Sequence, residues 1–169
     1  MRSRLLTLAL LLIAPFASAE PLDLTNAKNA EAATVLIARF FENIGLDVFR
    51  KGDTDFGLKA GGYRMMIVTI FNPDDGCRLN AYITYKGRKE NIGNAKLQSL
   101  VNEINDSYNY LVLSVSDKGD LSFRFTLLFD KKLEAKLVHR WLRMIERQTD
   151  AAMEEHMEKL QHFQAPEEK

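Results

Sequence analysis

Between positions 95 and 129 the spacing of apolar side chains changes from helical to extended. Up to Tyr108 apolar residues recur at intervals of three and four, which predicts a one-sided helix over residues 95–108: Leu97, Leu100, Val101, Ile104 and Tyr108. From Tyr110 to Phe129 apolar and polar residues alternate, which predicts two strands that each bury one face. Gly119 lies in the turn between them and accommodates the positive φ of a hairpin bulge.

A long terminal helix is predicted from about Lys132. Its core-facing residues extend to about Arg147: Leu133, Leu137, Val138, Trp141, Leu142, Met144 and Ile145. Beyond Thr149 the apolar residues become sparse among charges, and so small a domain does not need so long a helix. This extension is expected to project or fold back, with four candidate contacts for a partner protein or second subunit: Met153, Met157, Leu160 and Phe163. Packing on the parent domain, or fraying, is the alternative.

The earlier part of the chain predicts a helix followed by antiparallel strands. The alanine-rich residues 27–44 form the helix, which Gly45 ends. Strands are predicted at residues 48–50, 56–60, 63–71 and 78–85. Because residues 63–71 are almost continuously apolar, that segment is expected to be a central strand covered on both faces.

Residues 97–145 resemble the YbjN-domain family, and the likeness is plausible from about Ala30 onward. It is carried by the helix phrase Leu97-Gln-Ser-Leu-Val-Asn-Glu-Ile-Asn-Asp-Ser-Tyr108, the turn Asp117-Lys-Gly-Asp-Leu121, the strand to Phe129, and Leu137…Trp141-Leu142. Ile104 stands nearest to a position where the family has an aromatic residue, which is a departure. The resemblance implies a fold like that of type III secretion chaperones and a loosely defined regulatory role. It suggests a dimer and supplies no catalytic residues.

Together these patterns predict a single α+β domain with an antiparallel sheet packed by helices. The order is helix, strands, helix, β-hairpin and long helix. Residues 27–149 form this domain, residues 20–26 a leader, and residues 150–169 a helical extension and charged tail.

Residues 1–19 have the pattern of a signal peptide. Arg2 and Arg4 precede an apolar run at residues 5–13, Pro15 follows, and the small residues before Glu20 suit cleavage after Ala19. The run is too short to cross a membrane as a helix. We therefore expect a periplasmic or secreted protein that does not span a membrane after cleavage.

The charge balance argues against a nucleic-acid partner. The formal net charge is zero, and loss of Arg2 and Arg4 with the signal peptide makes it −2, whereas nucleic-acid binding needs a concentrated basic surface. One basic cluster stands out, and it belongs either to an exposed loop or to a contact with an anionic partner: Lys86, Arg88 and Lys89, with Lys96 nearby.

The candidate metal sites fail on spacing. Asp53 and Asp55 could open a calcium loop, but its sixth and twelfth positions hold Leu58 and Arg64 instead of glycine and an acid. Two histidines of the terminal helix are six residues apart, which does not place them on one helix face: His156 and His162.

No catalytic set is evident either. Cys77 is the one cysteine, so no intramolecular disulfide is possible. It is either a small buried strand residue or a thiol available to another chain. No Gly-x-Ser-x-Gly motif occurs. We therefore expect no metal, no cofactor and no enzymatic activity.

The favoured function is an exported, non-enzymatic module that binds or regulates another protein through an exposed sheet face, a strand edge or the terminal helix. A second copy of the same chain is one candidate partner. The alternative is binding of a small apolar ligand or lipid in a pocket between helix and sheet. That pocket would be lined by Phe40, Met65, Met66, Phe123, Phe125 and Trp141.

Overall fold

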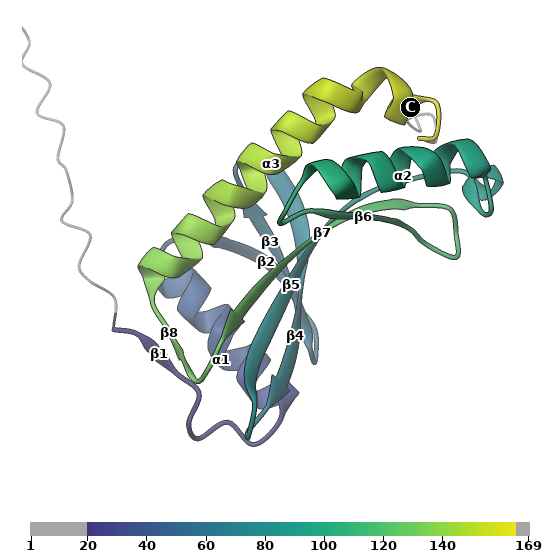
Figure 1. The fold of residues 1–169 in the computed structure, drawn as a ribbon. Coiled ribbons are helices and arrows are strands. Elements are labelled where there is room, and N and C mark those ends of the chain that lie inside the picture. Colours follow the sequence, from purple (N-terminus) through teal and green to yellow (C-terminus); the bar gives the residue numbers. More distant parts are fainter. Residues whose placement is uncertain (1–19, 165–169) are drawn as a thin grey trace, which may run out of the picture.

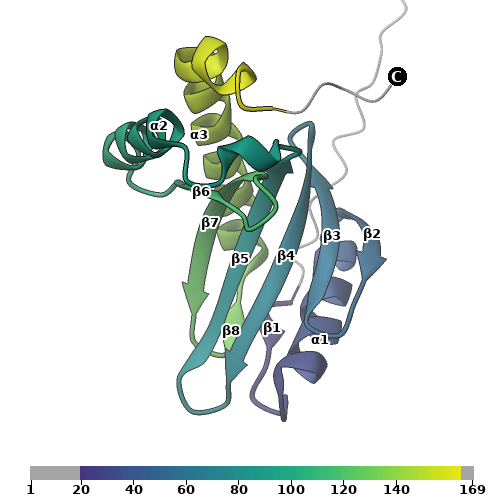
Figure 2. The same ribbon diagram turned by 90° about the vertical axis from the view of Figure 1, so that its right-hand side faces the viewer.

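The computed structural model describes residues 20–164, so the predicted signal peptide and the last five residues of the charged tail lie outside it. Six antiparallel strands form one sheet in the order β2-β3-β4-β5-β7-β6. The helices lie on one side of this sheet, and the other side is open (Figures 1 and 2). This arrangement confirms the predicted α+β class.

The elements follow one another in nearly the predicted order. Their bounds are β1 Leu22–Asp23, α1 Ala30–Asn43, β2 Asp47–Lys51, β3 Asp55–Ala60, β4 Tyr63–Asn72, β5 Gly76–Tyr85, the 3-10 helix η1 Lys89–Asn91, α2 Ala95–Ser107, β6 Val112–Val115, β7 Leu121–Phe129, β8 Lys132–Leu133 and α3 Ala135–Gln161.

Local sequence explains where the helices begin and end. The side chain of Asn29 accepts a hydrogen bond from the Ala32 N–H, and Asn94 does the same at the start of α2. After α1 the chain turns at Gly45, whose φ of 84° favours glycine. Gly119 has the same φ in the β6–β7 turn, as the hairpin pattern predicted.

The core lies between the helices and the inner face of the sheet. Alternate residues of each strand point into it, including the fully buried Phe56, Phe123 and Phe125. From α1, Phe41 meets Phe56 edge to face, with ring centroids 5.3 Å apart. Burial of these aromatic side chains fixes the sheet against the helix layer.

The structure corrects the prediction that residues 63–71 form a strand covered on both faces. β4 is central in the sheet, but the helices cover only one face of it. On the other face Met66 and Val68 are half-buried and Ile70 is 42% exposed. A continuous apolar run can therefore belong to a strand with an open face that still carries apolar side chains.

The terminal helix starts later than predicted, because Lys132 and Leu133 form β8. This short strand pairs with β1, so Leu22 and Asp23 of the predicted leader belong to the fold. Leu24 next to them is completely buried. Two-residue strands carry no periodicity, which is why the sequence pattern missed them.

The extension beyond Thr149 does not project as a separate segment. α3 runs unbroken to Gln161, and its last turns lie beside α2 (Figures 1 and 2). Ala152, His156 and Leu160 are buried on this side. Of the alternatives given above for the extension, packing on the parent domain describes these turns.

Candidate functional site

One half of β7 lacks a neighbouring strand on one side. β5 pairs with β7 along its whole length, whereas β6 pairs with it only as far as Val112↔Arg124. Within the described part of the chain, residues 125–129 therefore form an open strand edge. We call these five residues the free half of β7.

The side chains of the free half are apolar or uncharged. Phe125 and Leu127 point inward and are buried, at 0% and 8% exposure, while Leu128 on the open face is 70% exposed. Thr126 is exposed and donates a hydrogen bond to Asn80 Oδ1 at 2.9 Å. The segment has neither a charged residue nor a proline, which are the usual means of protecting a strand edge.

The position at which β6 begins has a structural cause. The side chain of Asn105 in α2 bonds both backbone groups of Leu113: Oδ1 accepts from its N–H at 2.7 Å, and Nδ2 donates to its carbonyl at 3.1 Å. One residue before β6, Leu111 turns into the core and is 1% exposed. The chain therefore enters β6 from α2 at Val112 and cannot cover the rest of β7.

The opposite edge of the sheet, β2, is protected. Its Arg50 and Lys51 pair with Asp55 and Glu42, with nitrogen–oxygen distances of 3.8 and 2.8 Å. The register of β2 against β3 also shifts between Val48 and Arg50. Charges and irregular register both discourage strand addition at this edge.

An aromatic side chain further closes the β2 edge. The ring of Phe49 lies so close to Gly57 that a Cβ at this glycine would be 2.6 Å from it. The Arg64 guanidinium lies over the same ring, 4.4 Å from its centroid. Phe49, although 44% exposed, is therefore already in contact with Gly57 and Arg64 of the same sheet.

A hollow of about 730 Å³ adjoins the end of the free half of β7 on the open face. Ile70, Leu128 and Phe129 supply its apolar wall, and Arg78 and Asp130 are among its polar residues. Cys77 also lines it, but this thiol is buried, and burial raises its pKa to about 12. The thiol therefore stays protonated at neutral pH, which does not favour a redox role.

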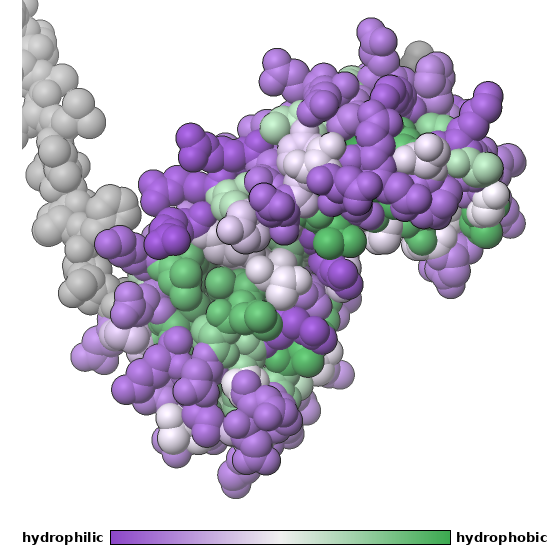
Figure 3. Space-filling model, viewed as in Figure 1, coloured by the Kyte–Doolittle hydropathy of each residue, from purple (hydrophilic) through white to green (hydrophobic). Residues whose placement is uncertain are grey.

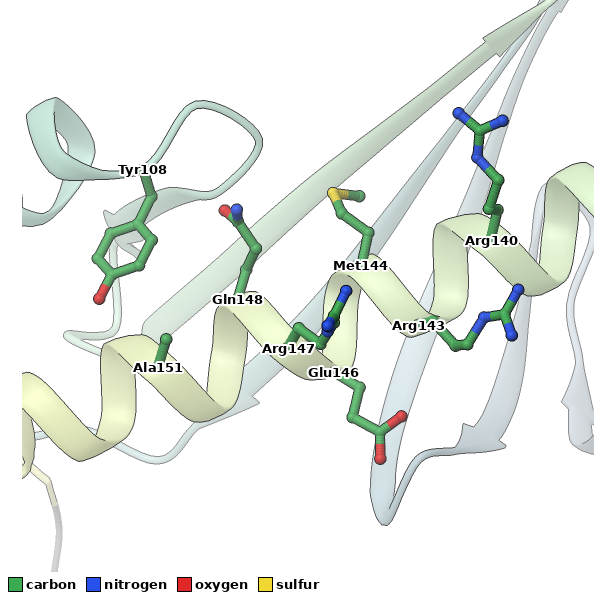
Figure 4. A pocket seen from close by; sticks show the side chains of 8 residues that line it. All are labelled: Tyr108, Arg140, Arg143, Met144, Glu146, Arg147, Gln148 and Ala151. Carbon is green, nitrogen blue, oxygen red and sulfur yellow. The ribbon is translucent and has the colours of Figure 1, made fainter.

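A second hollow, of about 920 Å³, follows the first half of α3. It is lined by Tyr108 and by Arg140, Arg143, Met144, Glu146, Arg147, Gln148 and Ala151 of α3 (Figure 4). The Tyr108 hydroxyl donates to Glu155 at 2.9 Å. Burial and this carboxylate raise the pKa of Tyr108 to about 12, so Tyr108 stays neutral and supports α2 on α3.

Figure 3 views the molecule toward the β7 edge. It shows apolar atoms gathered between the start of α3 and the sheet, with hydrophilic surface along α3. The half-buried Leu137 and Met144 belong to this part of α3. A strand added beside the free half would thus meet apolar side chains as well as unpaired backbone groups.

The four predicted contact residues do not form one exposed stripe. Leu160 is 1% exposed and belongs to the core, whereas Met157 is 38% exposed. Met153 and Phe163 are half-buried and pack against the core. In this conformation only Met157 presents a large part of its side chain to a partner.

All residues of the alternative ligand pocket except Met66 belong to the core. Phe40, Met65, Phe123, Phe125 and Trp141 are all buried, and Met66 lies on the other face of the sheet, since neighbouring strand residues alternate. Neither these residues nor Met66 line the hollows described above.

A buried histidine lies where α2 meets α3. His156 is 2% exposed, and its ring nitrogens lie 3.8 Å from Glu103 and Glu155 without a hydrogen bond. Residues 20–164 contain no group of three or more His, Cys, Asp or Glu side chains that could hold a metal ion. In the same range no helix is both long and apolar enough to cross a membrane.

Comparison with known proteins identifies the family. Residues 34–156 match the YbjN family, described as "Putative bacterial sensory transduction regulator". A crystal structure of YbjN, "a putative transcription regulator from E. coli", is similar with a TM-score of 0.54 and 15% sequence identity, covering 77% of this chain and 93% of that chain. No curated protein matches the sequence. Because the family match covers most of the chain, this protein belongs to the YbjN family.

Proposed function

We propose that this protein is an exported, non-enzymatic module that binds another protein by adding an extended segment of that protein to the free half of β7. The observation that carries the proposal is the contrast between this uncharged, unpaired edge and the protected edge at β2. Regulation through such binding agrees with the description of the family as a regulator of sensory transduction.

The free half supplies both parts of strand recognition. Its unpaired N–H and C=O groups offer main-chain hydrogen bonds, which are independent of the partner's sequence. Alternate side chains of the added strand would face α3 near Leu137 and Met144, and the others would face Leu128. This geometry favours a partner segment with apolar side chains at alternate positions.

Export is supported by the sequence pattern of residues 1–19, with its basic start, apolar run and small residues before Glu20. In an exported protein the partner would be a periplasmic or extracellular protein. A nucleic-acid partner is not proposed, because the formal net charge is close to zero.

Site-specific photocrosslinking in the producing cell tests the proposal. A benzoylphenylalanine replaces Leu128 within the free half in one strain, and Phe49 at the opposite edge in a matched strain. Both side chains are exposed, Leu128 at 70% and Phe49 at 44%, so a crosslinker at either position can reach a partner in solution. We expect a discrete protein adduct from position 128 and none from position 49.

A second measurement shows how the captured protein is held. With the purified pair, amide hydrogen exchange of residues 125–129 should slow, and Thr126→Lys should abolish the adduct, because an edge lysine disfavours strand addition. Equal adducts from both edges, or unchanged exchange at residues 125–129, would show that the free half is not the binding site.

A further inference from the structure

The outer face of α3 carries basic residues in its first half and acidic residues in its second. Spacings of three and four residues place them on one face of the helix: Lys136, Arg140, Arg143 and Arg147, then Asp150, Glu154 and Glu158. All seven are exposed, and the buried residues of α3 occupy the opposite face, including Val138, Ile145 and His156. We call these seven residues the charged stripe.

The four cations of the stripe have no ionic partner within residues 20–164. This holds although Glu146 and Asp150 follow Arg143 and Arg147 at a spacing of three. Glu154 and Glu158 are also without ion pairs among the described residues, and Asp150 accepts a hydrogen bond from the Tyr63 hydroxyl. The stripe is thus not a set of intrahelical salt bridges.

Helix stability does not account for the stripe either. Carboxylates near a helix N-terminus and cations near its C-terminus are the stabilising arrangement. In α3 the first turn has no acidic residue, and the only basic residue of the last turn is Lys159, which pairs with Glu103 at 2.8 Å. The separation of charge along α3 therefore points to something outside the chain.

The geometry points to a second copy of this chain: we propose that two α3 helices associate side by side and antiparallel through their charged stripes. A twofold axis between Arg147 and Asp150 would place Arg147 opposite Asp150 of the second copy. It would also place Arg143 opposite its Glu154. At a rise of about 1.5 Å per residue these pairs lie about 2 and 8 Å from the axis along the helix.

The next pair continues the same register. Arg140 and Glu158 lie at nearly equal distances on either side of the axis, about 13 and 14 Å from it. Near the axis the exposed residue is Ala151, whose small side chain does not hinder close approach. Three of the four cations thus meet a carboxylate of the second copy, as a twofold contact between complementary halves requires, and Lys136 lies beyond the last pair.

Other occupants fit the stripe less well. Arg140 and Arg143 point in different directions from α3 (Figure 4), so they do not converge on one small anion. An anionic membrane would be attracted by the first half of the stripe and repelled by Asp150, Glu154 and Glu158. A second copy satisfies both halves at once.

Because exposed ion pairs are individually weak and are screened by salt, the dimer should be weak and salt-sensitive. Sedimentation velocity of the mature chain, from Glu20 onward, tests this. We expect a concentration-dependent dimer at about 50 mM NaCl whose Kd rises at least about tenfold at about 500 mM. A chain that stays monomeric at high concentration and low salt would overturn the proposal.

Charge reversal tests the register. Arg140→Glu with Arg143→Glu makes the stripe mostly acidic, and Glu154→Lys with Glu158→Lys makes it mostly basic. Each double variant alone should be monomeric, and an equimolar mixture should form a heterodimer. Arg78→Glu with Arg124→Glu, on the open face of the sheet, changes the net charge equally and should still dimerise.

Two outcomes contradict the proposal. One is dimerisation of both stripe variants like the parent, with circular dichroism showing that all variants are folded. The other is a monomeric parent that binds phosphatidylglycerol vesicles and loses this binding in the Arg140→Glu, Arg143→Glu variant, which would assign the arginines to an anionic surface instead.

Discussion

At one edge of the sheet, β2 carries ion pairs, an irregular register and a phenylalanine that contacts a glycine and an arginine of the neighbouring strands. At the other edge, the free half of β7 has no charge, no register shift and a leucine that is 70% exposed. Both edges belong to the same sheet and face the same solvent. Because unprotected edges promote association, the proposed strand addition rests on this contrast between the two edges.

The two edges also differ in how they are anchored. β7 inserts Phe125 and Leu127 into the core, whereas all five residues of β2 are at least partly exposed. An edge that must accept a partner strand benefits from a rigid position, since little conformational freedom is then lost on binding. The free half of β7 therefore has unpaired backbone groups that are held in a fixed position.

The largest expected effect tests this anchoring. Phe125→Ala removes a completely buried ring and should lower the free energy of unfolding by about 3–5 kcal/mol. Phe49→Ala, at the opposite edge, should cost about 1 kcal/mol or less, because its ring is 44% exposed. Urea unfolding of both variants measures the difference. Equal losses would show that the two edges are anchored alike.

A smaller effect is expected from Asn105, which holds the start of β6. Asn105→Ala removes both side-chain bonds to Leu113 and should destabilise the fold by about 1–2 kcal/mol. Exchange of the Leu113 amide should become faster as β6 loosens. Gln98→Ala is the control, since Gln98 bonds only Asn102 on an exposed part of α2. Unchanged exchange at Leu113 would mean that Asn105 does not hold β6.

Protection of the β2 edge predicts a still smaller change. Arg64→Ala removes the cation over Phe49 and should cost about 0.5–1 kcal/mol. Lys59→Ala is a suitable control, because Lys59 is an exposed cation directly opposite Arg64 in the register. Thermal or urea unfolding compares them. If both substitutions are neutral, Arg64 does not contribute to closing this edge.

Periodicity predicted the parts of the fold that are long and one-sided. Both α2 and the β6–β7 hairpin occupy nearly the predicted residues, and Gly119 has the positive φ that the turn required. In these segments burial of one face is encoded in the local spacing of apolar residues. The order of elements and the α+β class follow from the same signal.

The candidate site depends on contacts between distant parts of the chain, which the local spacing of apolar residues does not show. The uncharged segment 125–129 was visible in the sequence, but the end of β6 opposite Arg124 depends on how Asn105 and Leu111 place the chain after α2. Likewise, the apolar residues past Thr149 showed an amphipathic helix without showing that α2 of the same chain covers it. Leu160 is buried for that reason.

The smallest change in stability should accompany a large change in binding. Leu128→Asp places a charge within the free half on a side chain that is 70% exposed, so the free energy of unfolding should change by less than about 0.5 kcal/mol. A charge at a strand edge disfavours strand addition, so affinity for the protein captured through position 128 should fall at least about tenfold, a loss of about 1.4 kcal/mol.

Phe49→Asp provides the matched comparison, because it adds the same charge at the other edge. Titration calorimetry with the captured protein should give nearly unchanged affinity for this variant, even though its stability falls somewhat more. Binding lost equally in both variants would point to a general effect of charge. Binding lost only in Leu128→Asp would assign recognition to β7, since the variant with the smaller structural disturbance would have the larger functional defect.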